Sequence, residues 1–143
     1  MSPKDLKYTA WLLLLLAVGG ARPLWAQAAG SLPPNRSVLD GVYTAEQATE
    51  GILLFGDKCA RCHAAVDFGA AKFRAKWVTH TLQELYARVS TTMPFDQPSS
   101  LRPTQYAQLV AFLLAVNGYP PGTKELGWEE NELNGIKIDP PFP

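Results

Sequence analysis

The sequence predicts an all-α domain with long loops, and three observations support this fold class. Three stretches repeat apolar side chains at positions i, i+3, i+4 and i+7, the spacing of one helix face. Two of these stretches begin with a capping box, which is a sequence signal for a helix N-terminus. The sequence shows no convincing hairpin signal and no internal repeat. We therefore expect about three main helices joined by long loops.

The first helix is expected from Ala45 to about Lys58. Thr44 is its predicted N-cap residue, with the Gln47 side chain reaching back to complete the capping box. One face of this helix carries Ala48, Gly51, Ile52 and Phe55. A glycine inside a helix costs about 1 kcal/mol relative to alanine. Gly51 is therefore easiest to explain if a second helix crosses closely at that point.

The second helix is expected from the N-cap residue Thr81 to near Ser90, where a second capping box starts another apolar stripe. The third helix is expected to start at Pro103, which suits the first helical position, and to stop at Asn117-Gly118. The apolar faces of these two helices contain Leu82, Leu85, Tyr86 and Val89, and then Tyr106, Leu109, Val110 and Leu113.

Residues 1–28 indicate a secretory signal peptide. Lys4 and Lys7 give a basic start, residues 10–20 form an uncharged apolar run, and residues 26–28 supply an A-x-A cleavage site. The run is short of the roughly 20 apolar residues that span a bilayer. We expect a protein exported to the periplasm, cleaved within 26–28, with no stable membrane span. A retained N-terminal anchor is the alternative.

The remaining chain divides into a lead-in at 29–43, a helical domain at 44–119 and a tail at 120–143. Proline, glycine and serine in the lead-in disfavour regular structure, and the tail is rich in proline, glycine and acidic residues. The sequence does not decide whether the tail binds a partner or wraps the domain. Its possible docking points are Leu126, Trp128, Leu133, Ile136 and Ile138.

The motif C-x-x-C-H at residues 59–63 is the attachment signature for a c-type haem. Cys59 and Cys62 are the only two cysteines, and on a helical turn they share a face with His63. Two thiols can then bond the two vinyl groups of one porphyrin while the imidazole reaches the iron from one side. The sequence therefore predicts one covalent haem c, held by Cys59 and Cys62, with His63 as an iron ligand.

Two other functions of a C-x-x-C pair remain as minor alternatives. A redox disulfide of the thioredoxin kind normally follows a strand in a βαβ unit, and the sequence shows no such pattern. A structural zinc site needs four ligands, and the chain has one other histidine and no other cysteine. With 13 basic and 13 acidic residues, the chain also lacks the basic excess of a nucleic-acid-binding domain.

Met93 is the candidate for the second axial ligand of the iron. It is the only methionine after residue 28, and Pro94 directs it into an extended conformation just past the second helix. A lone methionine is ordinarily a gap-filling core residue. His80 is the rival ligand and would give bis-histidine ligation, but just before a capped helix it is expected to face solvent or a haem propionate.

Three segments together resemble the bacterial class I cytochromes c: the haem motif at 59–63, Thr92-Met93-Pro94, and the last helical stretch at 106–114. The similarity covers about residues 42–118. The sequence between the motifs resembles that of small periplasmic monohaem cytochromes that accompany quinoprotein (PQQ-dependent) dehydrogenases. The similar segments include Ser100-Leu101 and Asn117-Gly118-Tyr119-Pro120.

The resemblance implies a fold in which the N- and C-terminal helices cross closely beside an exposed haem edge. The family's crossing residues correspond to Gly51 and Phe55, with Leu109 and Phe112 as partners on the last helix. Trp77, four residues after Phe73 on a possible helical turn, resembles the family's tryptophan that donates its indole N–H toward a haem propionate. Packing of Trp77 in the core is the alternative.

The sequence also departs from the family pattern. Many members carry a glycine after the haem histidine and a proline-containing loop whose carbonyl accepts from that histidine. Here Ala64 follows His63, and no proline occurs between His63 and Met93. A histidine ligand needs such a partner to fix its orientation, so we expect a carbonyl from residues 65–72 to serve.

The expected function is a single-electron carrier and not an enzyme, because both axial positions would be filled. The implied partners are redox proteins, with a periplasmic quinoprotein dehydrogenase as donor and a cytochrome or terminal oxidase as acceptor. The alternatives are a cytochrome subunit bound permanently in a dehydrogenase complex and a haem-based sensor with a labile sixth ligand.

Overall fold

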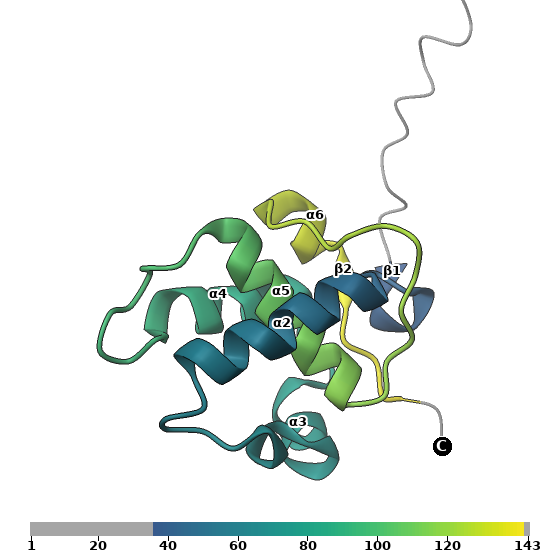
Figure 1. Ribbon diagram of the computed structural model, residues 1–143. Helices are drawn as coiled ribbons and strands as arrows, with labels where there is room; N and C mark the ends of the chain where they lie inside the picture. Colours follow the sequence, from purple (N-terminus) through teal and green to yellow (C-terminus); the bar gives the residue numbers. More distant parts are fainter. Residues whose placement is uncertain (1–35, 142–143) are drawn as a thin grey trace, which may run out of the picture. The chain divides into compact units, whose positions relative to one another are not determined.

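The computed structural model describes residues 36–141, and this part of the chain is mostly helical (Figure 1). The predicted all-α fold class is confirmed, and the arrangement is consistent with a cytochrome c fold. The predicted signal peptide lies outside the described range. The elements are β1 (Arg36–Ser37), η2 (Val38–Asp40), α2 (Ala45–Lys58), η3 (Ala65–Phe68), α3 (Ala70–Trp77), α4 (Leu82–Thr92), α5 (Pro103–Val116), α6 (Glu130–Asn134) and β2 (Ile136–Lys137).

The three main helices begin where their sequence signals lie. The Thr44 hydroxyl accepts the N–H of Gln47 at 3.1 Å and caps α2. At α4 the capping box is complete, because the Glu84 carboxylate accepts the Thr81 N–H at 2.7 Å while the Thr81 hydroxyl accepts the Glu84 N–H at 3.3 Å. Pro103 is the first residue of α5. Within residues 36–141 no helix has both the length and the hydropathy to cross a bilayer.

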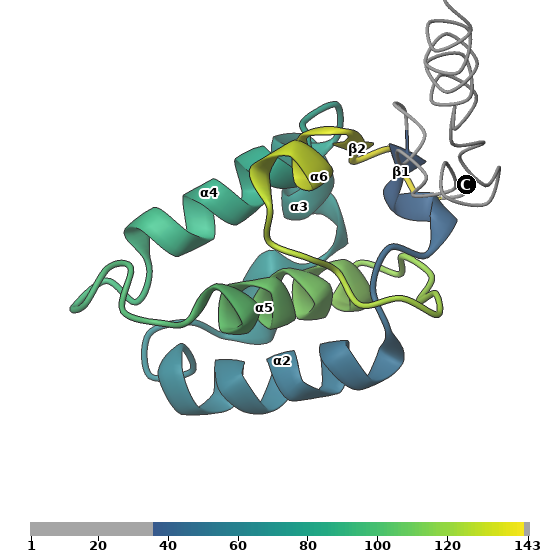
Figure 2. The ribbon, with the colours of Figure 1, turned by 90° about the horizontal axis from the view of Figure 1, so that it is seen from above.

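Helix α5 lies between α2 and α4, and α2 crosses it at close range (Figures 1 and 2). A Cβ atom on Gly51 would come within 2.8 Å of the Phe112 Cβ and closer still to the Gln108 carbonyl oxygen. The rings of Phe55 and Phe112 lie 4.9 Å apart at the same crossing. The close approach predicted at Gly51 is therefore present, and a larger residue there would separate the helices.

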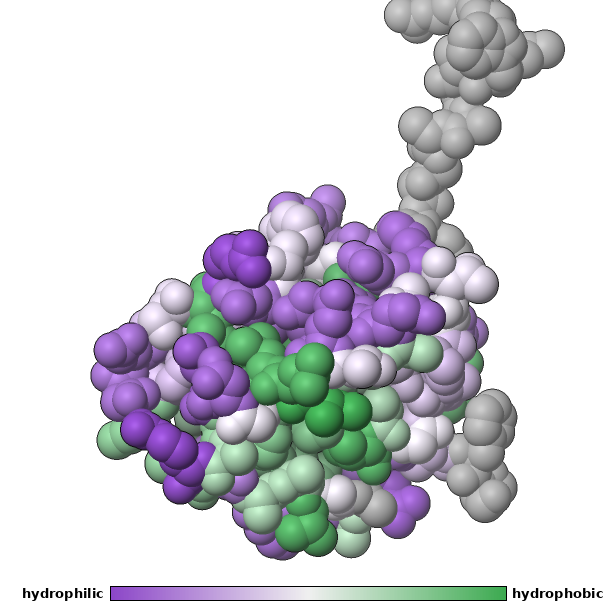
Figure 3. Space-filling model, in the orientation of Figure 1, coloured by the Kyte–Doolittle hydropathy of each residue, from purple (hydrophilic) through white to green (hydrophobic). Residues whose placement is uncertain are grey.

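Ile52 departs from the predicted buried face of α2. Its side chain is 50% exposed, and the neighbouring Leu53 is 71% exposed. Apolar surface accordingly gathers over the middle of α2 on the face shown in Figure 3.

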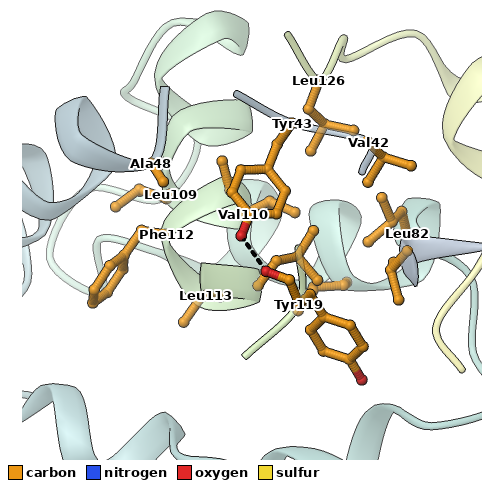
Figure 4. Close-up of a cluster of buried hydrophobic side chains, with 14 of the residues drawn as sticks. Val42, Tyr43, Ala48, Leu82, Leu109, Val110, Phe112, Leu113, Tyr119 and Leu126 are labelled. Atoms are coloured by element: carbon orange, nitrogen blue, oxygen red, sulfur yellow. Dashed lines mark hydrogen bonds between the residues drawn. The ribbon is translucent and has the colours of Figure 1, made fainter. Parts of the chain in front are cut away.

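The lead-in is packed rather than linker-like where the structure describes it. Val38, Val42 and Tyr43 are at most 3% exposed. The Tyr43 hydroxyl donates to the Tyr119 carbonyl at 2.5 Å (Figure 4). These contacts form because apolar residues of the lead-in meet the buried side of α5, a long-range contact that local composition does not reveal.

The tail joins the same core. Strand β2 pairs in parallel with β1 of the lead-in, Arg36 beside Ile136 and Ser37 beside Lys137. Four of its expected docking points are at most 3% exposed, and these are Leu126, Leu133, Ile136 and Ile138. Trp128 is 43% exposed. The boundary drawn at residue 119 therefore divides segments that share one hydrophobic core.

Gln47 has a different role from the one its position in the capping box predicts. Its side-chain amide donates to the Leu126 carbonyl at 2.9 Å and accepts the Leu126 N–H at 2.8 Å. The side chain is 4% exposed. Gln47 therefore holds the tail against the start of α2 and does not reach back to Thr44.

Candidate functional site

One open, mostly apolar cavity contains the predicted haem residues. Its empty space is about 840 Å³, part of which is open solvent. The walls come from the end of α2, from η3, from the loop after α4, and from α5. The lining residues are Phe55, Lys58, Cys59, Arg61, Cys62, His63, Phe68, Val89, Met93, Pro94, Phe95, Asp96, Leu109, Phe112 and Leu113.

The C-x-x-C-H motif forms a tight turn at the end of α2. Cys59 caps the helix, and its carbonyl accepts the N–H groups of both Cys62 and His63 at 3.0 Å. This turn brings all three side chains to the cavity, as their spacing predicts. Neither cysteine is in a disulfide. Burial raises the pKa of the Cys59 thiol, whereas Cys62 is exposed.

Met93 reaches the cavity from the end of α4. It caps that helix in an extended conformation, φ −128° and ψ 151°, as expected for a residue before proline. Its carbonyl accepts a hydrogen bond from the Tyr106 hydroxyl at 2.9 Å. The sequence pattern places Tyr106 only in an apolar stripe, although a buried tyrosine hydroxyl usually has a polar partner. The need of a buried tyrosine hydroxyl for a polar partner is the one signal in the sequence that points to this contact.

The structure does not bring His80 or Trp77 to the cavity lining. The His80 Nδ1 lies 3.1 Å from a Glu84 carboxylate oxygen at the start of α4. The Trp77 ring is partly buried against the core, with its centroid 5.7 Å from that of His80 and 5.1 Å from the Lys76 Nζ. Met93, and not its rival His80, therefore shares the cavity with His63. The contact of Trp77 with a propionate stays a prediction.

The segment beneath His63 is held by a residue that the sequence marked only as a helix stop. The Asn117 side-chain amide donates to the carbonyl of Phe68 at 2.9 Å and to that of Leu113 at 2.7 Å. The Phe68 ring packs edge-on against His63 with centroids 5.2 Å apart. In residues 36–141 no hydrogen bond of the His63 ring is present, so its carbonyl acceptor among residues 65–72 stays a prediction.

The rim of the cavity carries one ion pair. Arg61, inside the motif, lies 3.4 Å from the Asp96 carboxylate, and both side chains are mostly exposed. An exposed pair of this kind contributes about 0–1 kcal/mol to stability. It does, however, connect the attachment turn to the loop that follows Met93.

The residues of this cavity fit a c-type haem. Two thiols are available for thioether bonds, an imidazole and a thioether are available as iron ligands, and the walls are otherwise mostly aromatic or aliphatic. Within the described range no group of three or more His, Cys, Asp or Glu side chains is placed to hold a metal ion by itself. Two thiols, an imidazole and a thioether at one apolar cavity are the donor set that suits iron carried in a porphyrin.

Comparison with known proteins supports the same assignment. Residues 46–113 match the model of a family described as "Cytochrome C oxidase, cbb3-type, subunit III". The match covers just under half of the chain and includes the haem motif, Met93 and most of α5. No curated protein and no solved structure matches the chain. The match supports a class I cytochrome c domain, haem c with iron, and a haem-based electron carrier.

Proposed function

We propose, from the cytochrome c match at residues 46–113, that this chain is a periplasmic monohaem carrier of single electrons. The observation that carries the proposal is the meeting of Cys59, Cys62, His63 and Met93 at one apolar cavity. When bound, a haem c supplies an iron that alternates between Fe(II) and Fe(III). Cys59 and Cys62 would attach the porphyrin, and His63 and Met93 would bind the iron.

The side chains around the site set its reactivity. If His63 and Met93 both bind the iron, it would offer no open position to oxygen or a substrate, which distinguishes a carrier from a haem enzyme. The neutral Met93 thioether and apolar walls such as Phe112 and Leu113 disfavour the extra positive charge of Fe(III). Both effects raise the reduction potential.

The proposed partners are other redox proteins. A quinoprotein dehydrogenase is the proposed donor, on the strength of the sequence similarity to cytochromes that accompany such enzymes. A more oxidising cytochrome or a terminal oxidase is the proposed acceptor. Such redox encounters bury little surface, below about 1,200 Å², and are transient.

The packing of the tail favours a free carrier over a permanently bound subunit. A long tail would favour a permanently bound subunit if it served to bind a second protein, because a free carrier needs no such extension. Leu133, Ile136 and Ile138 are fully buried in the chain's own core. These side chains are therefore not available to hold a second protein.

Met93→Ala tests the ligand assignment in the purified holoprotein. Wild type should show a low-spin spectrum with a weak near-infrared Met–Fe(III) charge-transfer band, and it should not bind carbon monoxide. The variant should lose the band, bind carbon monoxide, and fall in potential by on the order of 0.1 V, a fraction of the roughly 0.8 V that axial ligands span. His80→Ala is the matched control and should behave as wild type.

The opposite outcomes discriminate the alternatives. If Met93→Ala keeps the wild-type spectrum and His80→Ala does not, His80 is the ligand. If wild type is high-spin and binds carbon monoxide readily, the protein is a sensor. If expression with a maturation system yields no haem on Cys59 and Cys62, the C-x-x-C pair is a thiol–disulfide centre.

A further inference from the structure

A single hydroxyl group ties the two ends of the loop that carries Met93. The Tyr106 hydroxyl donates to the Met93 carbonyl at 2.9 Å and accepts the Leu101 N–H at 3.3 Å. Met93 directly follows α4, and Leu101 lies two residues before α5. One oxygen atom of α5 is therefore hydrogen-bonded to both ends of the loop that joins α4 to α5.

The position of this hydroxyl is well fixed. Tyr106 is 3% exposed and lies in the first turns of α5. Its ring meets that of Tyr86 edge-on, with centroids 6.2 Å apart and an interplanar angle of 79°. The Tyr86 hydroxyl donates in turn to the Pro103 carbonyl at 3.3 Å. The packing of the Tyr106 ring against Tyr86, which is itself hydrogen-bonded to Pro103, therefore fixes the position of the Tyr106 hydroxyl.

Apart from this hydroxyl, the loop is held by exposed contacts, among them the 3.4 Å ion pair between Asp96 and Arg61. Phe95 is 86% exposed, and residues 96–100 are exposed as well. Its other bond to a helix is the exposed one from the Ser99 hydroxyl to the Ser90 carbonyl at 3.1 Å. Among the described residues, Tyr106 is the hydrogen-bond partner of the Met93 carbonyl. The Met93 N–H also donates to the Val89 carbonyl of α4 at 3.0 Å, so loss of the hydroxyl would leave Met93 attached to α4 and release only its carbonyl side, where the exposed loop begins.

We propose that Tyr106 is a positioning residue that fixes Met93 at the cavity and sets how firmly its thioether holds the sixth position of the iron. This proposal rests on the proposed function. A loop that is held at both ends loses less conformational entropy when Met93 binds than a loop that is free. We call the two hydrogen bonds of the Tyr106 hydroxyl, to Met93 and to Leu101, the clamp. Loss of the clamp should therefore raise the fraction of molecules in which Met93 has left the iron, by about 5- to 10-fold for one hydrogen bond.

The test compares Tyr106→Phe with Tyr43→Phe in the ferric holoprotein, with imidazole as the competing ligand. Tyr43 is the matched control, because its buried hydroxyl also donates to a backbone carbonyl, that of Tyr119, but makes no bond to the loop that carries Met93. Both variants should lower the melting temperature. Only Tyr106→Phe should bind imidazole about 5- to 10-fold more tightly and lose its near-infrared Met–Fe(III) band at lower temperature than wild type. Equal imidazole affinities in the two variants would overturn the proposal.

Hydrogen exchange in the wild-type holoprotein gives a second test that needs no variant. The Leu101 amide should be protected when Met93 is bound, and saturating imidazole should accelerate its exchange. Unchanged exchange after imidazole has displaced Met93 would overturn the clamp. A wild-type protein without the near-infrared band would overturn both the ligand assignment and the clamp, whereas a normal band with equal variants would overturn the clamp alone.

Discussion

Gln47 shows at the level of one residue how the tail is joined to the domain. Its amide makes both of its hydrogen bonds to the backbone of Leu126, which lies 79 residues away in the sequence. The sequence predicted that α2 starts after Thr44, because capping is local. It could not predict the role of Gln47, because a glutamine at this position serves equally as part of a capping box and the competing partner is distant in the chain.

Gln47→Ala should lower the free energy of unfolding by about 2–4 kcal/mol, because it leaves two buried backbone groups without partners. Gln108→Ala is the control, since its amide bonds the Glu50 carboxylate at 2.6 Å on the surface, and it should cost less than about 0.5 kcal/mol. Chemical denaturation of the two variants measures the difference. Equal losses would show that the Gln47–Leu126 pair does not hold the tail.

Glu84 is a second residue whose environment has a measurable consequence. Two hydrogen bonds hold the pKa of Glu84 below its ordinary value of 4.5. The larger effect comes from the backbone N–H of Thr81 and the smaller from the His80 side chain. A carboxyl with a lowered folded-state pKa adds stability above its unfolded pKa, and this is lost as the pH falls through the folded value. An NMR titration should therefore place the Glu84 midpoint below 4.5, and a midpoint at or above 4.5 would contradict the capping geometry.

At the level of elements, α5 supports both sides of the site. Tyr106 near its start binds the carbonyl of Met93, and Asn117 after its end binds the carbonyl of Phe68 beside His63. The periodic pattern predicted α5 and its buried face. The hydrogen bonds were not predictable in the same way, because the carbonyls they bind belong to irregular segments whose path depends on the whole fold.

The crossing of α2 and α5 gives a paired prediction. Gly51→Ala would place a Cβ against the backbone carbonyl of Gln108, and it should cost at least about 1–3 kcal/mol through overpacking. Gly56→Ala lies in the same helix with no atom within 4 Å of the new Cβ, and it should gain about 0.5–1 kcal/mol. Thermal unfolding of the two variants measures the contrast. Stabilisation by both would rule out the close crossing.

At the level of the whole molecule, most of the hydrophobic core lies away from the cavity. Only Phe55, Leu109, Phe112 and Leu113 belong both to the core and to the cavity lining in the described residues. The lead-in and the tail close the other side of α5 through β1, β2 and their buried side chains. The apolar residues of the tail were visible in the sequence, but two-residue strands paired across 100 positions leave no periodic signal.

This division predicts that stability and ligation respond separately to substitution. Leu133→Ala, at a fully buried position of the tail, should cost about 2–5 kcal/mol while leaving the near-infrared band and the reduction potential unchanged. Leu53→Ala makes the same chemical change at a position that is 71% exposed, and it should cost less than about 0.5 kcal/mol. A shifted potential in Leu133→Ala would show that the tail also controls the site.

The central claim is that Cys59, Cys62, His63 and Met93 hold one closed haem that exchanges single electrons. A spectroelectrochemical titration of the purified wild-type holoprotein tests it most directly. The account predicts one reversible one-electron transition, in which the near-infrared Met–Fe(III) band appears on oxidation and carbon monoxide leaves the reduced spectrum unchanged. A high-spin spectrum that shifts with carbon monoxide, or a titration without a one-electron transition, would contradict it.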